Sequence, residues 1–453
     1  MNKIEILELE TLLLSALKGK MTLFLPDEER QALVTFALEA ALKEDAGGEF
    51  RRALPGASEK TDFIESFLSY GVVEDLLCDA DVEDIIINAL KPIYIHHAQK
   101  GFVCTNKKFS SRRELDIFIQ KLIVFSGRHG YNKIANVELA NLAGRVNIVD
   151  TPLGPQLTIT KAKVDPLSII DLLKRGSMSY EVAGQLWLYM EGLSIRPANV
   201  IIAGGPGTGK TTLLNALLAF IPPKDRLVVI EDTLELNTFL EDSCSRLETD
   251  DNLSLSDLVK NSLRMRPERV IVGEVRGAEA RDMITAVNIG KYCMSTIHAL
   301  TAKEAIMRLN NEPMNVPLML INLIDVFVIL KRYHVDGRLF RIVDEVTEIS
   351  GMENNHILRH EIFKYNYEQK KVMASSPSTI YRDRLAQETG LTPRDIIAET
   401  WIRANVLKNL SERGVHTIKE VATFCRFYTT NPGEAMQKIG LDRQHMLQEI
   451  NKK

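Results

Sequence analysis

The chain has 453 residues, of which 26% are charged and 45% are hydrophobic, and its formal net charge is −4. This length allows two or three domains that each bury a core of their own. The composition argues against an intrinsically disordered chain and against a strongly basic nucleic-acid-binding surface. No apolar run reaches the ~20 residues that span a bilayer, and the acidic, amphipathic N-terminus is unlike a secretory signal, so we expect a protein inside the cell.

Residues 1–60 carry the apolar periodicity of helices and end in a segment rich in Gly, Pro, Ser and charge, which indicates a loop or hinge. The apolar face of LETLLLSAL belongs either to an ordinary helical bundle, which we favour, or to a docking site for a membrane protein. Residues 61–165 predict a smaller α+β domain. In it, VEDIIINAL and KPIYIHHAQKGFVCT have strand patterns, Ser111 and Glu114 predict a helix with a capping box, and AGRVNIVDTPLGPQLTITKAK predicts a strand pair.

Residues 166–198 have the pattern of a helical connector, whereas residues 199–350 alternate short apolar strands with helices. The four strand segments are NVIIAG, RLVVIED, RVIVGEV and YCMSTIH. This alternation predicts an α/β fold with a parallel sheet that is covered on both faces and that binds its ligand at the carboxyl ends of the strands.

A β-rich segment follows the fourth of these strands, and we expect a hairpin turn at Asp336 and Gly337. Residues 351–453 predict an extension that is mostly helical. Thr392 and Pro393 are typical of a helix start, and Gly414 is typical of a helix end.

The segment IIAGGPGTGKTTLLNALL places a glycine-rich loop between a strand and a helix, with the spacing of a P-loop. Glycines let backbone N–H groups curl around phosphate oxygens, and the helix that follows directs its positive end at the anion. Lys210 can reach the β- and γ-phosphates, and the Thr211 hydroxyl can ligate Mg²⁺. The alternative is a glycine-rich turn that only joins strand to helix. We expect the nucleotide to contact Gly204, Gly205, Pro206, Gly207, Thr208, Gly209, Lys210, Thr211 and Thr212.

Acidic residues follow two of the predicted strands. Glu231 and Asp232 can hold Mg²⁺, directly or through water, and can orient the attacking water; the alternative for both is helix capping or surface charge. In RVIVGEVRG, the aspartate that usually binds Mg²⁺ after the hydrophobic strand of a P-loop ATPase is absent, because Gly273 precedes Glu274. Metal binding therefore depends on Thr211 and the Glu231–Asp232 pair, and Glu274 is the candidate general base.

Basic residues also gather in this part of the sequence. An arginine near the phosphates can offset the charge that develops on the leaving group, although each arginine here could equally be a surface residue. The candidates are Arg246, Arg264, Arg266 and Arg276. His298 follows the strand YCMSTI, where a γ-phosphate sensor would lie; a lone histidine is more often structural.

Cysteine and histidine spacings give no sign of a metal centre. The five cysteines include no C-x-x-C pair, so neither a zinc ribbon nor a disulfide framework is expected, and free thiols suit a reducing cytosol. His356 and His360 could ligate a metal together if they lay on a helix, but no acidic or thiolate side chain converges on them, so we expect a solvated pair and no zinc.

Five segments in order resemble the ATPase superfamily that powers type II and type IV secretion, type IV pili and the archaellum: GGPGTGKTTLLNAL, VVIEDTLEL, RLET, DLVKNSLRMRPERVIVGEVRGAEA and STIHA. The resemblance continues upstream in GVVEDLLCDADVEDIIINALKPIYI and GRVNIVDTPLGPQLTITK. Downstream, the segment from RDRLAQETGL to CRFYTTNP resembles the archaeal pilus and archaellum branch, and the chain is also similar to Tad pilus ATPases. The resemblance is weakest over residues 1–60.

The resemblance implies a RecA-like domain after a smaller N-terminal domain, a homohexameric ring with nucleotide between the two domains, and ATP and Mg²⁺ as ligands. It also implies that the chain drives a polytopic membrane platform protein. The chain would then be cytoplasmic and held peripherally at the membrane by this partner. Residue by residue, Lys210 and Thr211 match the Walker A pair, and Glu231 and Asp232 match the acidic Asp box. Glu274 matches the Walker B glutamate.

Four further positions match the family, and three depart from it. His298 matches the second histidine of the His box, Arg145 matches an N-domain arginine that approaches nucleotide, and Arg246 and Arg264 match candidate arginine fingers. The His box usually begins Gly-His, but Lys291 follows Gly290 here, and a lysine adds fixed charge where a histidine could switch. Thr160 and Lys161 also stand where the family usually has an arginine.

We therefore expect an ATP-hydrolysing motor for pilus assembly or protein secretion. One alternative is a nucleic-acid translocase on the same RecA-like core, which the net charge and the lack of a basic, aromatic-rich tract do not favour. The other is a nucleotide-gated scaffold with weak hydrolysis, which Lys291 suggests.

Overall fold

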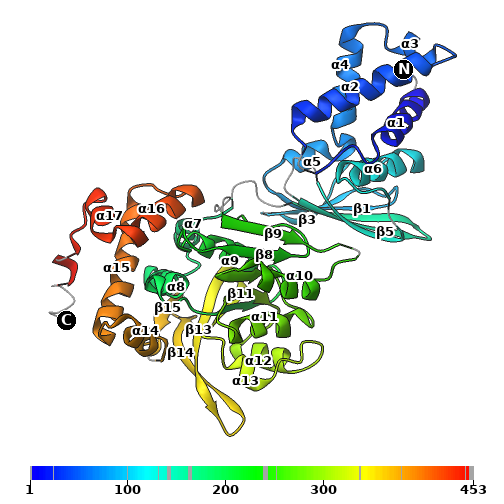
Figure 1. Cartoon of the computed structure of the whole chain (residues 1–453). Coiled ribbons are helices and arrows are strands. Elements are labelled where there is room, and N and C mark those ends of the chain that lie inside the picture. The colour runs from blue at the N-terminus through cyan, green and yellow to red at the C-terminus, as the bar shows by residue number, and fades with distance from the viewer. Residues whose placement is uncertain are drawn as a thin grey trace. The chain divides into compact units, whose positions relative to one another are not determined.

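The computed structural model describes residues 3–23, 25–98, 100–130, 132–139, 144–161, 166–237, 243–250, 252–335, 338–378, 380–443 and 445–447. The chain forms two compact units, Met1–Val164 and Asp165–Lys453, and each is described by itself (Figure 1). The expected turn at Asp336 and Gly337 lies outside the described residues.

The first unit combines a helical layer with an antiparallel sheet. Its helices are α1 (Lys3–Leu17), α2 (Asp27–Glu44), α3 (Glu49–Ala53), α4 (Ala57–Leu68), α5 (Glu74–Cys78) and α6 (Arg112–Phe125). Its strands are β1 (Val82–Asn88), β2 (Tyr94–His97), β3 (Gly101–Cys104), β4 (Ile134–Glu138), β5 (Gly144–Thr151) and β6 (Gly154–Lys161). They pair in the order β3-β2-β1-β6-β5-β4. The predicted strand pair is the β5–β6 hairpin.

Helix α6 lies between two cores because its apolar residues cover more than one face. Leu115 and Leu122 pack in the sheet core, and Val124 and Phe125 pack in the core of α1, α2 and α4. The apolar face of LETLLLSAL is buried in that helical core, for example at Leu13, so the packing supports the bundle interpretation. The expected capping box at the start of α6 is shifted by one residue. Ser111 Oγ accepts from Glu114 N at 3.2 Å, whereas the Glu114 carboxylate accepts from Ser110 N at 2.8 Å.

The second unit is a nine-stranded sheet with helices on both faces. The strands are β7 (Val200–Gly204), β8 (Leu227–Glu231), β9 (Cys244–Glu248), β10 (Arg269–Val272), β11 (Tyr292–Ile297), β12 (Val326–Val335), β13 (Arg338–Glu353), β14 (His356–Asn366) and β15 (Lys371–Ala374). Their order is β15-β14-β13-β12-β7-β11-β10-β8-β9. The six strands from β12 to β9 are parallel, as predicted, and β13, β14 and β15 extend the sheet in antiparallel fashion.

Alternation along β7 directs side chains to two cores. Val200 and Ile202 face α7 (Ile169–Lys174), α8 (Tyr180–Glu191), α9 (Lys210–Leu218) and the C-terminal helices, whereas Ile201 and Ala203 face the helices of the opposite layer. The C-terminal helices are α14 (Ile380–Thr389), α15 (Pro393–Glu412), α16 (Ile418–Thr430) and α17 (Pro432–Lys438). The opposite layer contains α10 (Leu255–Ser262), α11 (Glu279–Asn288), α12 (Ala302–Asn310) and α13 (Leu318–Ile321) (Figure 1).

This architecture confirms the predicted fold class, a RecA-like α/β domain after a smaller α+β domain and before a helical extension. The extension shares a hydrophobic core with α8 and α9, and β13 runs through residue 350, where we placed the end of the ATPase domain. Thr392 caps α15 with Pro393 in its first turn, and Gly414 follows its end with a φ of +81°. His356 and His360 lie on β14 and not on a helix.

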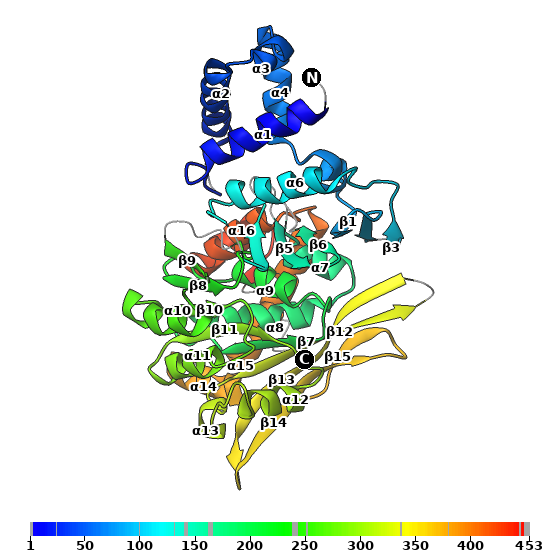
Figure 2. The same ribbon diagram turned by 90° about the vertical axis from the view of Figure 1, so that its right-hand side faces the viewer.

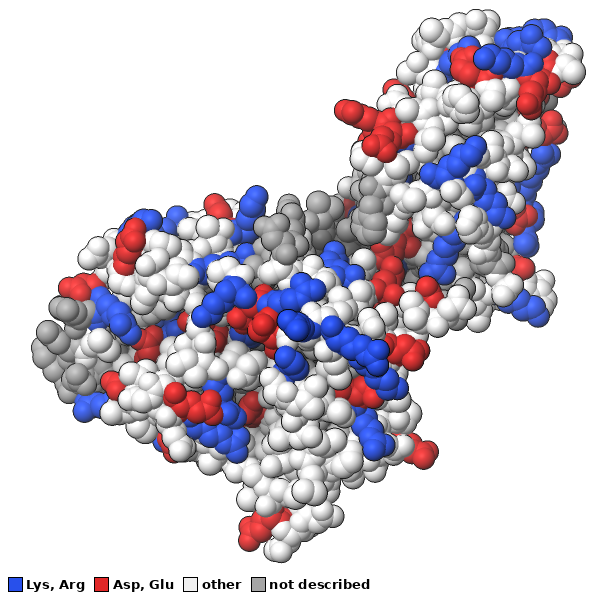
Figure 3. All heavy atoms as spheres, viewed as in Figure 1, with Lys and Arg blue, Asp and Glu red and all other residues white. Residues whose placement is uncertain are grey.

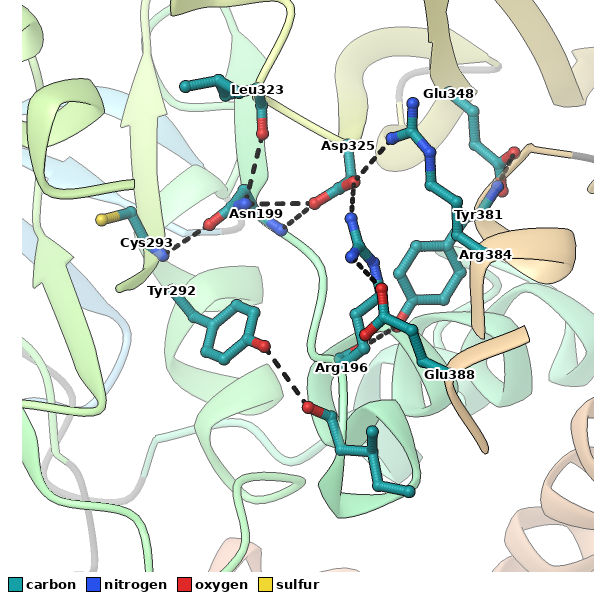
Figure 4. Close-up of polar contacts among 11 residues, drawn as sticks. Arg196, Asn199, Tyr292, Cys293, Leu323, Asp325, Glu348, Tyr381, Arg384 and Glu388 are labelled. Carbon is teal, nitrogen blue, oxygen red and sulfur yellow. Dashed lines mark hydrogen bonds and ion pairs between the residues drawn. The ribbon is translucent and has the colours of Figure 1, made fainter. Parts of the chain in front are cut away.

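A buried polar network ties together the amino ends of three strands (Figure 4). Asn199, just before β7, donates from N and Nδ2 to Asp325 Oδ2 at 2.8 and 3.1 Å, and Asp325 just precedes β12. Asn199 Oδ1 accepts from Cys293 N on β11 at 2.9 Å. Arg196 and Arg384 lie 3.9 and 3.6 Å from Asp325 Oδ1. Because Arg384 belongs to α14, the helical extension helps to fix this edge of the sheet.

Candidate nucleotide site

The P-loop lies at the carboxyl edge of the parallel strands, where the sequence predicted it. β7 ends at Gly204, and α9 begins at Lys210. Gly209 has a φ of +92°, which favours glycine, and a Cβ added to Gly204 would lie 2.5 Å from Thr208 Oγ1 and 2.9 Å from the Leu330 carbonyl oxygen. These glycines keep the loop tight and leave its N–H groups at the start of α9, which is the geometry that suits phosphate.

Lys210 is buried, and its ammonium group contacts the loop and a neighbouring strand end. Nζ donates to the Gly205 carbonyl oxygen at 3.2 Å and lies 3.2 Å from His298 Nδ1. Burial lowers the pKa of Lys210, and the nearby Glu274 carboxylate opposes this shift. Thr211 and Thr212 lie half-buried in the first turn of α9, where their N–H groups are among those that a helix leaves unpaired.

Glu274 and His298 come together from two neighbouring strand ends. Glu274 follows β10, His298 follows β11, and His298 Nε2 lies 2.8 Å from Glu274 Oε1. Glu274 Oε1 is buried and receives no hydrogen bond of good angle, whereas Oε2 accepts from Arg276 Nη2 at 2.6 Å. Burial lowers the pKa of His298, and the Glu274 carboxylate opposes this shift. The site thus has an oriented carboxylate beside a lysine, linked through one imidazole.

Glu231 has a structural position that the sequence did not reveal. It is 3% exposed, and its carboxylate accepts from the N–H groups of Glu235 and Leu236 at 3.0 and 3.1 Å, so it holds the loop after β8. Arg246 Nη2 lies 3.7 Å from Glu231 Oε2. Burial raises the pKa of Glu231 to about 7, against the effect of these hydrogen bonds. Asp232 is exposed, 3.8 Å from an Arg276 nitrogen, and remains the more accessible of the two acids.

The structure places the remaining predicted residues at several locations. Arg246 lies on β9 and faces Glu231, as described above. Arg264 lies in the turn Leu263–Met265 before β10, at the amino edge of the sheet, so it is not at the P-loop of its own chain. Arg145 lies on β5 in the first unit, and its predicted nucleotide contact stays a prediction. Lys291 precedes β11, whereas His298 follows it, which puts them about 20 Å apart.

Three arginines near the site are not among the residues that the sequence predicted. Arg308 on α12 donates to the His298 carbonyl oxygen, and Arg341 on β13 donates from Nε to the Gly207 carbonyl oxygen at 2.9 Å. Arg332 on β12 lies beside the same glycine. In the sequence, two of them are marked only by the β-strand pattern in which they lie. They reach the loop through strand pairing, which the sequence does not show.

The residues present fit a nucleoside triphosphate better than a metal held by protein alone. Among the residues that the structure describes, no group of three or more His, Cys, Asp or Glu gathers to hold an ion. Mg²⁺ typically takes one or two protein oxygens, several waters and the substrate phosphates, and the Thr211 hydroxyl in the first turn of α9 suits such a site. Within the described part of the chain, no helix has both the length and the apolar character to cross a membrane.

Comparison with known proteins shows the family of the chain. An uncharacterized protein of Methanocaldococcus jannaschii is 34% identical over 272 residues, which are 58% of this chain and 99% of that protein. Conjugal transfer protein TrbB of Rhizobium radiobacter is 30% identical over 304 residues, 62% of this chain and 89% of that protein. The X-ray structure of the Legionella pneumophila ATPase DotB covers 86% of this chain and 95% of its own, with 18% identity and a TM-score of 0.44. The model of the family "Type II/IV secretion system protein" matches residues 133–345. The chain therefore belongs to the type II/IV secretion system protein family.

Proposed function

We propose that the chain is a Mg²⁺-dependent ATPase that powers a secretion or pilus-assembly system through a polytopic membrane platform protein. The observation that carries this proposal is the contact chain from Lys210 through His298 to Glu274, at the carboxyl edge of the sheet beside the P-loop. Phosphoryl transfer needs a lysine for the phosphates and a carboxylate for the water, and this site has both, with the Glu274 carboxylate half-buried.

In the proposed reaction, the P-loop N–H groups and Lys210 hold the β- and γ-phosphates of ATP. Glu274 Oε1 accepts a proton from a water molecule as the water oxygen bonds to the γ-phosphorus. The bond from that phosphorus to the bridging oxygen breaks, and its electron pair leaves with ADP. Arg276 and His298 hold Glu274 in place for this step. Thr211 and the phosphates would hold Mg²⁺, which would supply positive charge to offset that of the phosphate oxygens.

The acidic and basic residues around this centre receive proposed roles that follow from their positions. Asp232 is exposed and can reach the metal through water, whereas Glu231 is occupied with the loop after β8. Arg264, at the amino edge, can reach phosphate only in a neighbouring copy. This proposed contact needs a ring, which we take to be a homohexamer, and Arg246 and Arg145 stay candidates for its nucleotide contacts.

A secretion role follows from the family and from relatives named for conjugal transfer. The chain would lie at the cytoplasmic face of the membrane, where hydrolysis changes its shape and a platform protein receives the motion. Acidic and basic side chains lie side by side on the face shown in Figure 3, which does not favour a nucleic-acid translocase. Lys291 lies at the far end of β11 from His298, which supports the motor over a scaffold that barely hydrolyses ATP.

Steady-state phosphate release with Mg²⁺ and ATP tests the proposal. Lys210→Ala should abolish turnover, and Glu274→Gln should bind ATP without releasing phosphate. Normal hydrolysis by either variant would refute these roles. Strong stimulation by DNA or RNA would favour the translocase, and tight ATP binding with negligible turnover by the unmodified protein would favour the scaffold.

A further inference from the structure

Strands β12 and β13 extend beyond the end of the P-loop strand. Leu330 on β12 pairs with Gly204, the last residue of β7, so the residues after Leu330 continue alongside the phosphate loop. In this overhang Arg332 pairs directly with Arg341 across β12 and β13. Figure 2 shows these two yellow strands reaching past β7.

Both arginines reach the loop. Arg341 Nε donates to the Gly207 carbonyl oxygen at 2.9 Å, and its Cδ lies 3.8 Å from the position that a Cβ on Gly209 would occupy. Arg332 Nη1 lies 3.0 Å from the position of a Cβ on Gly207. Two guanidinium groups therefore flank the middle of the phosphate loop.

Asp344 of this hairpin is paired with other cations. Neighbouring positions place Tyr333 against Phe340, with stacked rings, so the aromatic side chains take the opposite face. Asp344 pairs with Lys331 at 2.9 Å and with Lys364 at 3.3 Å. In the described ranges, neither Arg332 nor Arg341 has a carboxylate within 4.0 Å, and both are exposed.

Two like charges directly opposite each other on antiparallel strands destabilise a hairpin unless an anion offsets them. The order of the strands indicates which phosphates of a nucleotide could offset these two charges. β12 lies on one side of β7, whereas β11 and β10, which carry His298 and Glu274, lie on the other. The arginine pair therefore approaches the loop from the side away from the proposed general base.

We propose that Arg332 and Arg341 bind the phosphates of the nucleoside diphosphate part of the nucleotide, apart from the attacking water. This inference rests on the proposed function. Guanidinium groups make bidentate, charge-assisted hydrogen bonds with phosphate. Such contacts hold ATP and ADP alike, so they set nucleotide affinity and not the chemical step.

Titration with fluorescent ATP and ADP analogues tests the pair in the full-length chain. Arg332→Ala and Arg341→Ala should each weaken the binding of both nucleotides by about tenfold, and the double variant should bind more weakly than either single variant. KM should rise as nucleotide affinity falls, while kcat changes by less than about threefold. The matched control is Arg359→Ala, an exposed arginine on β14 of the same sheet. A double variant that binds ADP as the Arg359→Ala control does would overturn the inference.

Competition and assembly measurements distinguish phosphate binding from a contact between subunits. Inorganic tripolyphosphate should compete with the nucleotide in the unmodified chain, and only at higher concentration in the double variant, where the P-loop and Lys210 still bind phosphate. Loss of ring assembly with unchanged nucleotide binding would mean that the partner is a carboxylate of a neighbouring copy, and would overturn the inference. If neither Lys210→Ala nor the double variant changed nucleotide affinity, the proposed function itself would be refuted. If Lys210→Ala lost affinity and the double variant did not, only the role of the arginine pair would be refuted.

Discussion

His298 Nε2 lies 2.8 Å from Glu274 Oε1, and the other ring nitrogen lies 3.2 Å from Lys210 Nζ. One imidazole therefore joins the lysine of the P-loop to the proposed general base. A change at the phosphate that moves the ammonium group would alter the contact of His298 and, through it, the orientation of Glu274. This makes His298 a positioning residue for hydrolysis.

His298→Ala should lower kcat by about 10²-fold while nucleotide affinity stays within about threefold, because the side chain orients the carboxylate and does not hold the base or ribose. Phosphate release and nucleotide titration measure the two quantities. The control is His356→Ala, an exposed histidine on β14. Equal loss of affinity and kcat would instead assign His298 to nucleotide binding.

Arg276→Ala should lower kcat by about tenfold, because Glu274 Oε2 loses its 2.6 Å contact and the carboxylate can rotate away from the water. Arg276→Lys should recover only part of this loss, since lysine lacks the planar geometry of the guanidinium group. Steady-state kinetics measures both variants, and the control is Arg281→Ala, which changes an exposed arginine on α11. No difference between the two alanine variants would show that Arg276 does not orient Glu274.

Glu231→Gln should change how stability depends on pH. The folded carboxyl has a pKa raised to about 7, against 4.5 for the ordinary group, so the folded state holds the proton more tightly than the unfolded state. The free energy of unfolding therefore falls as pH rises from about 4.5 to about 7, by up to about 3 kcal/mol from this group. Glutamine keeps an oxygen for the N–H groups of Glu235 and Leu236 and does not ionise, so the variant should lose this decline.

Denaturant unfolding of both proteins at pH 5 and pH 8 measures the effect. The variant should be more stable than the unmodified protein at pH 8, and the difference should shrink at pH 5. Glu235→Gln, at an exposed position in the same loop, is the matched control and should follow the unmodified protein. Parallel pH profiles for the unmodified protein and Glu231→Gln would contradict the raised pKa.

Asp325→Ala should lower the free energy of unfolding by about 3 kcal/mol, because it leaves Asn199 and two arginines without their shared carboxylate. Because this network lies at the amino edge, away from the P-loop, nucleotide affinity should change by less than about twofold while the variant stays folded. Thermal unfolding and nucleotide titration test the two parts. Asp383→Ala, on the exposed side of α14, is the control. Unchanged stability of Asp325→Ala would show that the network does not hold the strand ends.

The sequence by itself determined the features that depend on neighbours along the chain. The glycine spacing of the P-loop, the Thr392 cap of α15 and the two-residue alternation of β7 each require only nearby residues and local backbone geometry. For this reason the parallel sheet, the strand order along the chain and the general place of Lys210 and Glu274 could be predicted.

Only the tertiary structure decided which distant residues meet. It buried Glu231 against the loop after β8, placed Arg264 and Lys291 at the amino edge, and joined the C-terminal helices to the core of α8 and α9. It also brought Arg332 and Arg341 to Gly207 through the pairing of β12 with β7. Strand pairing across more than a hundred residues depends on how whole elements pack, and no local pattern in the sequence encodes which side chains such pairing brings to the phosphate loop.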